Sequence, residues 1–269
     1  MPAKGTRKKI VGLIPAAGTS ERLSPLPCSK EIYPVEFDSS LENKISRPKV
    51  VSQYLLEAMH EVDVNKVYVI IRKGKWDILN YLGSGQWLGM NLAYLIMDLP
   101  FGVPFTLDQA YHFVKEDIVV FGFPDIIFKP KDAFNRLLER QILTNSDVVL
   151  GLFCAPQPFK SQHMVGTDSG GSVTGFEIGP SQTKLKSTWI IALWDNRFTH
   201  FLHEYVSIES LRFKKSHALK MDPIVEEVSM THVLDAALQK GLKIDSITFE
   251  EGAFLDIGTP ENLEKALQK

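Results

Sequence analysis

Residues 12–35 read GLIPAAGTSERLSPLPCSKEIYPV. An almost uninterrupted apolar run, residues 10–17, leads into this stretch and predicts a strand that is buried on both faces. The strand gives way to a small and polar turn, formed by Ala16, Ala17, Gly18 and Thr19. Because small side chains let a polyphosphate approach backbone N–H groups, the turn predicts a phosphate-binding loop. Arg22 and Lys30 then supply the positive charge that triphosphate chemistry requires. Neither the P-loop pattern GxxxxGK(S/T) nor the dinucleotide pattern GxGxxG occurs here.

The rest of the chain alternates apolar, β-rich runs with segments of helical periodicity. Strands are expected at residues 10–17, 66–72, 92–97, 117–123, 147–153, 172–178, 186–194 and 243–249. Helices are expected at residues 50–59, 76–82, 106–114, 132–142, 198–205 and 225–240, and from Pro260 onward. Residues 157–171 predict a mobile loop, and residues 214–221 an exposed connection. The alternation favours an α/β fold with a mostly parallel sheet and helices on both faces. Such sheets bind ligands beyond the carboxyl ends of their strands, here in the loops after Ala17 and Phe123.

The composition is that of an ordinary globular protein. With 269 residues, 44% hydrophobic and 23% charged, the chain is long for one domain but within the range of a single α/β unit. The net charge of -2 argues against nucleic-acid or membrane binding. No stretch is long enough to cross a bilayer. Two cysteines, Cys28 and Cys154, make no disulfide framework, which favours a reducing, cytoplasmic compartment. We expect a mobile tail over residues 1–9 and one domain over residues 10–269, and an oligomer stays possible.

The loop after the first strand resembles the signature of the sugar-phosphate nucleotidyltransferases of the glucose-1-phosphate thymidylyltransferase type. Their pattern is roughly LAGGxGTRLxP, then K, then LxPV, and the matching residues are Ala16, Gly18, Arg22, Leu23, Pro25, Lys30, Pro34 and Val35. The resemblance implies that Arg22 contacts the triphosphate and that Lys30 neutralises developing charge. It also implies the three-layer α/β/α, GT-A-like fold of the nucleotide-diphospho-sugar transferases. Ser20 and Glu21 depart from the usual Gly-Thr, and a carboxylate near a triphosphate is costly unless it points to solvent or to a metal.

Two aspartates far apart in the sequence are candidates for a metal site. Asp125 follows the strand expected at residues 117–123, and a carboxylate at the end of a central strand suits magnesium. The alternative is an aspartate that only caps a turn. Asp256 lies in GAFLDIGTPENLEKA, which is similar to the family pattern WLDxGTPExxxxA. The Thr-Pro-Glu of this segment fits a helix start, whereas Asp256 precedes the cap and has no such explanation. The resemblance implies that both aspartates bind one magnesium ion.

The parts that would recognise the base and the sugar match the family less well. Gly102 matches the glycine of the family's PxGLA-like turn, where it would let a base or ribose approach the backbone. Met97 stands where the family has a base-reading Gln, and a thioether is a poor hydrogen-bonding group. On the sugar side, Ile178 and Gly179 replace the family's Glu and Lys. The resemblance favours dTTP or UTP, but the residues themselves predict neither base nor sugar.

The resemblance implies a magnesium-dependent nucleotidyltransferase that joins a nucleoside triphosphate to a sugar 1-phosphate and releases pyrophosphate. The protein would supply position and charge to an in-line displacement, without a covalent nucleophile. Two alternatives stay open. One is a protein that binds nucleotide or nucleotide-sugar with impaired catalysis, which the departures at Ser20, Glu21 and Met97 and the missing Glu-Lys pair favour. The other is a glycosyltransferase on the same fold, although no DxD metal motif ends a central strand.

Overall fold

The structure is a computed structural model that describes residues 9–38, 47–98, 101–158, 162–218 and 227–268. The tail expected at residues 1–9 lies outside this part of the chain, except for Lys9. None of the helices in the described residues combines the length and the apolarity that crossing a bilayer requires.

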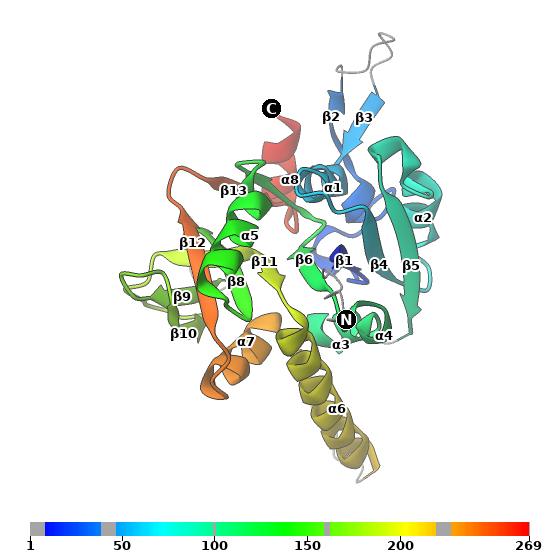
Figure 1. Cartoon of the computed structure of the whole chain (residues 1–269). Helices are drawn as coiled ribbons and strands as arrows, with labels where there is room; N and C mark the ends of the chain where they lie inside the picture. The colour runs from blue at the N-terminus through cyan, green and yellow to red at the C-terminus, as the bar shows by residue number, and fades with distance from the viewer. Residues whose placement is uncertain (1–8, 39–46, 99–100, 159–161, 219–226, 269) are drawn as a thin grey trace, which may run out of the picture.

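The elements follow one another as shown in Figure 1. The strands are β1 (Ile10–Ala16), β2 (Pro34–Asp38), β3 (Arg47–Val50), β4 (Lys66–Arg72), β5 (Asn91–Met97), β6 (Ile118–Gly122), β7 (Ile126–Lys129), β8 (Val148–Cys154), β9 (His163–Thr167), β10 (Val173–Ile178), β11 (Ser187–Trp194), β12 (Ile244–Phe249) and β13 (Ala253–Asp256). The α-helices are α1 (Val51–His60), α2 (Trp76–Leu82), α3 (Val103–Asp108), α4 (Tyr111–Val114), α5 (Ala133–Thr144), α6 (Asn196–Ala218), α7 (Met230–Gln239) and α8 (Pro260–Leu267). Short 3-10 helices are η1 (Glu21–Leu23), η2 (Lys30–Ile32) and η3 (Gln86–Leu88).

A nine-stranded sheet forms the centre of the molecule. Its path is β10-β9-β11-β6-β1-β4-β5, and β8 pairs with both β11 and β12. β1 is parallel to β4 and β6, β4 is parallel to β5, and β12 is parallel to β8. β11 is antiparallel to β6, β8 and β9, and β10 is antiparallel to β9. Among the described strands of this sheet, β10 and β11 therefore run against the common direction, and the prediction of a mostly parallel sheet is confirmed.

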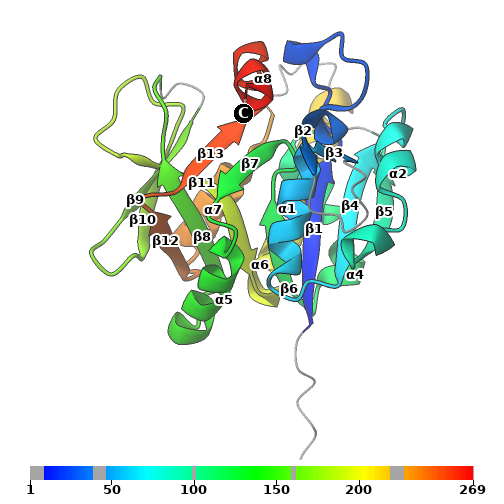
Figure 2. The ribbon, with the colours of Figure 1, turned by 90° about the horizontal axis from the view of Figure 1, so that it is seen from above.

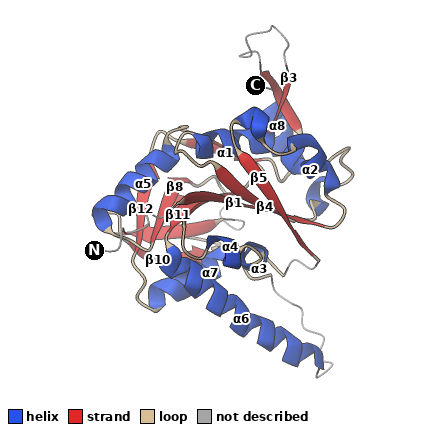
Figure 3. Ribbon diagram, turned by 45° about the vertical axis from the view of Figure 1, so that its right-hand side comes forward, coloured by secondary structure: helices blue, strands red, loops and turns tan. Residues whose placement is uncertain are grey.

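Side chains alternate along the strands between two apolar layers. On β1, Val11 and Leu13 pack with residues of α3, α4, α6 and α7, whereas Ile14 and Ala16 pack with residues of α1, α2 and α5. Figure 3 shows these two groups of helices on opposite faces of the sheet. A strand that is covered on both faces needs apolar residues at every position, which explains the continuous apolar run that predicts β1. The predicted three-layer α/β/α architecture is confirmed.

Two predictions about loops are wrong. Part of the loop expected at residues 157–171 forms β9, where Met164 and Val165 are buried. This strand is short and flanked by polar residues, so its periodicity is weak. Residues 214–218 of the expected connection continue α6, and residues 219–221 lie outside the described part of the chain. α6 extends away from the body of the molecule (Figure 1), and the polar residues of its distal part are also typical of an exposed connection.

Two predicted helices have different bounds in the structure. The helix expected at residues 106–114 is two short helices, α3 and α4. The helix expected at residues 225–240 begins at Met230, where the hydroxyl of Ser229 accepts a hydrogen bond from a first-turn N–H. Residues 225 and 226 lie outside the described part. These differences do not move the strands that carry the site.

The loops after β1 and β6 leave the sheet at the same edge, because these strands are parallel neighbours. β7 and β13 form a separate two-stranded sheet that the sequence analysis did not predict. β13 and α8 lie on the side toward which β1 runs (Figure 2). We call this side, formed by the loops after β1 and β6 together with β7 and β13, the carboxyl edge.

Candidate active site

The loop after β1 leaves room beside its backbone. Ala16 and Ala17 are buried against the sheet, whereas Gly18 and Thr19 are exposed. Ser20 has a left-handed backbone with a φ of 59°, which turns the chain into η1. A Cβ added at Gly18 would meet no atom within 4 Å. The predicted phosphate-binding turn therefore presents an accessible backbone to a ligand.

Four charged side chains converge at the carboxyl edge. Lys30 Nζ lies 2.5 Å from Asp125 Oδ2. Asp256 Oδ1 accepts a hydrogen bond from the N–H of Gly258 at 2.7 Å. Arg22 flanks the same glycine, because a Cβ added at Gly258 would lie 2.9 Å from Arg22 Nη2 and 2.8 Å from Asp256 Oδ1. Residues from three distant parts of the sequence thus form one charged cluster: Arg22, Lys30, Asp125 and Asp256.

Backbone pairing holds the two aspartates close together. β7 begins directly after Asp125 and pairs with β13, so that Asp256 lies opposite Ile126. The N–H of Ile257 donates to the C=O of Asp125 at 3.1 Å. α8 then begins with Thr259 at its N-cap, as predicted, and the threonine hydroxyl accepts a hydrogen bond from a first-turn N–H. The cap is therefore provided by Thr259, and the Asp256 side chain belongs to the charged cluster.

The cluster is electrostatically strained in a way that favours a cation. Burial raises the pKa of Asp256, and the charge of Asp125 raises it further, against the opposing effects of a backbone N–H, Lys30 and Arg22. Burial alone would lower the pKa of Lys30, but Asp125, together with nearby acidic groups, raises it above its ordinary value. Two partly buried carboxylates thus repel each other, and a bound cation would relieve this repulsion.

Two cavities meet at Asp125 and Phe123, which line both of them. The first-loop cavity, of about 130 Å³, is also lined by Ala17, Gly18, Lys30 and Gly102. The aromatic cavity, of about 210 Å³, is also lined by Gln162, His163, Thr188, Trp189, Phe254 and Asp256. Among the described residues that line the aromatic cavity there is no Lys or Arg. The two cavities therefore offer different chemistry on the two sides of one aspartate.

Gly102 belongs to the first-loop cavity, whereas Met97 does not. The φ of Gly102 is 118°, and a Cβ added there would collide with the C=O of Val228, so both backbone conformation and packing require glycine. Met97 is buried in the core, with the Thr106 hydroxyl 3.1 Å from its sulfur. Glu21 is exposed, which removes the electrostatic objection to a carboxylate in this loop. The departures at these positions therefore leave the cavity itself intact.

A buried ion pair between Glu31 and Lys75 stabilises the backbone next to Lys30. Lys75 Nζ lies 2.6 Å from Glu31 Oε1, and Glu31 Oε2 is buried without a hydrogen-bond partner among the described residues. Burial raises the pKa of Glu31 and lowers the pKa of Lys75. Glu31 follows Lys30 directly and lines the same cavity, so the pair anchors the backbone that carries Lys30. The sequence analysis missed this pair, because nothing local connects the two residues.

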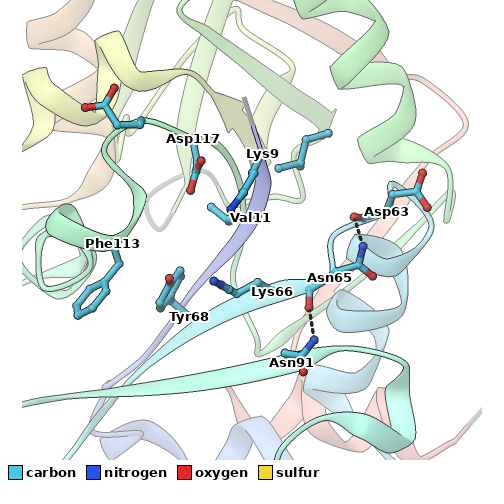
Figure 4. Close-up of a pocket in the computed structure, with 11 residues that line it drawn as sticks. Lys9, Val11, Asp63, Asn65, Lys66, Tyr68, Asn91, Phe113 and Asp117 are labelled. Carbon is cyan, nitrogen blue, oxygen red and sulfur yellow. Dashed lines mark hydrogen bonds between the residues drawn. The ribbon is translucent and has the colours of Figure 1, made fainter. Parts of the chain in front are cut away.

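A larger hollow, of about 790 Å³, lies at the opposite edge of the sheet (Figure 4). Its lining includes Lys9, Lys66, Tyr68, Phe113 and Asp117, which come from the amino-terminal ends of β1 and β4 and from the segment before β6. Most of these side chains are exposed or half-buried, and none belongs to a predicted site. Because ligands of parallel sheets bind at the carboxyl ends of the strands, the smaller cavities are the better candidates.

No protein-family profile matches this chain. The chain is 25% identical over 264 residues to the low-salt glycan biosynthesis nucleotidyltransferase Agl11 of Haloferax volcanii. The aligned region covers 96% of this chain and 65% of that protein. A structure described as a glucose-1-phosphate thymidylyltransferase from Bacillus anthracis superimposes with a TM-score of 0.75 at 20% identity, covering 96% of this chain and 94% of the other. A UDP-glucose pyrophosphorylase from Acinetobacter baumanii gives a TM-score of 0.69 at 14% identity, covering 96% and 92%. The predicted resemblance is confirmed.

No local sequence pattern predicts the wall of the aromatic cavity. Trp189 lies in an apolar run that predicts core, and His163 has no metal-ligand spacing, so neither had a local signal. Ile178 is exposed, and neither it nor Gly179 lines the cavity. The family's Glu and Lys at these two positions are therefore not replaced in place by other polar groups.

Proposed function

We propose that this chain is a nucleotidyltransferase that joins a nucleoside triphosphate to a sugar 1-phosphate, giving a nucleotide-sugar and pyrophosphate. The observation that carries the proposal is the charged cluster of Arg22, Lys30, Asp125 and Asp256 between two adjoining cavities. The descriptions of the curated relative and of the two similar structures support it. The chain spans 65% of the length of that relative, so the relative's activity enters here only as support for the proposal.

In the proposed reaction the first-loop cavity takes the nucleotide. Backbone N–H groups around Gly18, with Arg22 and Lys30, bind the triphosphate, and Gly102 lets the nucleoside approach the backbone. The aromatic cavity takes the sugar ring. The phosphate of the sugar then lies near Asp125, where the two cavities meet. An oxygen of the sugar phosphate then forms a bond to the α-phosphorus, the bond to the bridging oxygen breaks, and pyrophosphate leaves with the electron pair. Lys30 and Arg22 stabilise the charge that develops on the leaving group.

Magnesium fits the two aspartates. Among the described residues no group of three or more His, Cys, Asp or Glu side chains is arranged to hold a metal. Magnesium does not need such a group, since it binds through one or two carboxylates plus substrate phosphates and water. The raised pKa of Asp256 beside Asp125 agrees with a site that gains from a cation. When bound, the metal supplies Lewis-acid stabilisation of the phosphate oxygens.

The proposal includes UTP or dTTP as the nucleotide and a cytosolic setting. The base assignment is supported by the two similar structures, which are described as a UDP-glucose pyrophosphorylase and a glucose-1-phosphate thymidylyltransferase. The setting is supported by the free thiols of Cys28 and Cys154. Both belong to the proposal and require a direct test.

The test is pyrophosphate release from UTP, dTTP, CTP, ATP and GTP, each with glucose 1-phosphate and other hexose 1-phosphates. The proposal predicts turnover with UTP or dTTP that requires magnesium and stops on chelation. Absence of turnover across the whole panel would contradict it. Tight nucleotide binding without turnover would instead support the catalytically impaired binding protein, and hydrolysis of a supplied nucleotide-sugar would support a glycosyltransferase.

A further inference from the structure

His163 is held by the protein on one side of its ring. The residue begins β9 and lines the aromatic cavity. Its C=O accepts a hydrogen bond from the Thr188 hydroxyl at 2.9 Å, which ties β9 to β11. Its Nδ1 lies 2.6 Å from Oγ1 of Thr231, a fully buried residue in the first turn of α7. The imidazole therefore has a defined orientation.

The direction of this hydrogen bond follows from a third residue. Trp189 Nε1 lies 2.9 Å from Thr231 Oγ1, and an indole N–H can only donate. Among the described residues, the remaining partner of the Thr231 hydroxyl is His163 Nδ1. If Nδ1 donated instead, the buried hydroxyl proton of Thr231 would have no acceptor among the described residues, so this proton points to Nδ1, which accepts it. A neutral imidazole that accepts at Nδ1 carries its own proton on Nε2.

The ring remains uncharged near neutral pH. Burial lowers the pKa of His163, and the nearby His232 lowers it further. His232 is itself oriented, because its Nδ1 accepts a hydrogen bond from the backbone N–H of Ser229 at 3.1 Å. His163 is therefore a neutral hydrogen-bond donor and adds no positive charge to the aromatic cavity.

The Nε2–H of His163 is available to a ligand. Nε2 has no hydrogen-bond partner among the described residues, and it is not one of the buried side-chain atoms that lack a partner. Since His163 lines the aromatic cavity, this N–H faces accessible space. The neighbouring rings of Phe123, Trp189 and Phe254 suit the uncharged body of a small molecule. In such a cavity a few polar side chains fix the orientation of the ligand.

We propose that His163 determines the specificity for the acceptor by donating one hydrogen bond from Nε2 to an uncharged oxygen, a hydroxyl of the sugar. This inference rests on the proposed function and assigns the substrate-facing atom within it. A phosphate would not be stabilised deep in this cavity, because Asp125 and Asp256 line it and no described Lys or Arg does. The sugar's phosphate therefore stays where this cavity meets the first-loop cavity, beside Lys30, and its hydroxyl-bearing ring reaches His163.

The first measurement is the tautomer of His163 by ¹⁵N NMR, with its signals assigned by their loss in His163→Gln. We expect a neutral ring protonated at Nε2 at pH 7. A ring protonated at Nδ1, or a charged ring, would overturn the inference. This measurement needs no substrate, so it distinguishes failure of the inference from failure of the proposed function.

The second measurement compares binding of UDP-glucose and dTDP-glucose with binding of UDP and dTDP, with magnesium, by calorimetry. His163→Leu should weaken binding of the nucleotide-sugars about tenfold and leave the nucleoside diphosphates within about twofold, as expected for one lost hydrogen bond. His163→Gln, which keeps an N–H donor, should retain most of the affinity. Equal losses for nucleotide-sugars and diphosphates, or equal losses in both variants, would overturn the inference. Failure of the wild-type protein to bind any of the four ligands would contradict the proposed function.

Discussion

The two cavities beside Asp125 differ in how the chain builds them. The first-loop cavity takes much of its lining from one continuous stretch, which supplies Ala17, Gly18, Lys30 and Glu31. The aromatic cavity takes its lining from β9, β11 and β13, which are brought together only by the fold. A lysine and small residues characterise the first, whereas rings, neutral polar groups and the two aspartates characterise the second. The half proposed to bind polyphosphate is thus predictable from local sequence, and the half proposed to select the acceptor is not.

The two aspartates, of which Asp125 lines both cavities and Asp256 lines the aromatic one, should be the most sensitive positions. Asp125→Ala and Asp256→Asn should each lower the rate of pyrophosphate release by about a thousandfold, because a carboxylate proposed to bind the metal is lost. Asparagine can still accept the hydrogen bond from the Gly258 N–H, so the fold should persist. Retention of more than a tenth of the activity in either variant would show that the metal lies elsewhere.

Asp256→Asn should also change the stability of the protein. Because the pKa of Asp256 is raised, the folded state binds its proton more tightly than the unfolded state. The carboxyl therefore favours folding below its ordinary pKa, and this contribution is lost as the pH rises through the raised pKa. At pH 7 Asp256→Asn should raise the Tm by about 2 °C, and at pH 3 the gain should vanish. A lower Tm at pH 7 would contradict this account of the cluster. As the pH is lowered, the activity of the wild type should begin to fall above the ordinary pKa range of aspartate, because protonation of Asp256 removes a proposed metal ligand.

The next prediction compares a lysine at the carboxyl edge with a lysine in the hollow at the opposite edge. Lys30→Met should lower kcat/KM for the nucleoside triphosphate about a hundredfold, because a charge that stabilises the leaving group is removed. The matched control is Lys66→Met, in the hollow of Figure 4, which should change activity less than twofold. Comparable losses in the two variants would indicate that the hollow takes part in the reaction.

A smaller effect concerns the nucleotide half alone. Gly102→Ala should raise KM for the nucleoside triphosphate about tenfold, since alanine is strained at a φ of 118° and its Cβ would displace the backbone at Val228. KM for the sugar 1-phosphate should change little. Gly18→Ala serves as the comparison, because a Cβ there meets no protein atom and therefore tests the space left for the ligand. If Gly102→Ala changed both KM values equally, the two cavities would not be separable.

The smallest effect concerns the acceptor half. Thr231→Val leaves the Trp189 indole N–H without its acceptor, and it should lower the free energy of unfolding by about 1–2 kcal/mol. It should also raise KM for the sugar 1-phosphate about threefold, because the proton on His163 is no longer directed to Nε2. Thr231→Ser keeps the hydroxyl and should restore the acceptor KM. An unchanged acceptor KM in Thr231→Val would contradict the role given to His163.

The parallel sheet, the accessible turn after β1 and the two aspartates of the charged cluster were predictable, because each has a local pattern: a buried apolar run, small residues at a strand end, or an acid before a helix cap. Phosphate and metal binding at these residues stay predictions. The sequence did not predict β7 and β13, although their pairing is what places Asp125 beside Asp256. It also missed the Glu31–Lys75 pair and the Thr231 hydrogen bonds to His163 and Trp189. These contacts join segments that are distant in the sequence, and no periodicity records them.

A crystal structure grown with UTP or dTTP and magnesium is the most direct test of the charged cluster. The account predicts a triphosphate along the loop after β1, within reach of Arg22 and Lys30, and a metal ion coordinated by Asp125 and Asp256. A nucleotide bound in the hollow at the opposite edge, or a metal that neither aspartate touches, would contradict it.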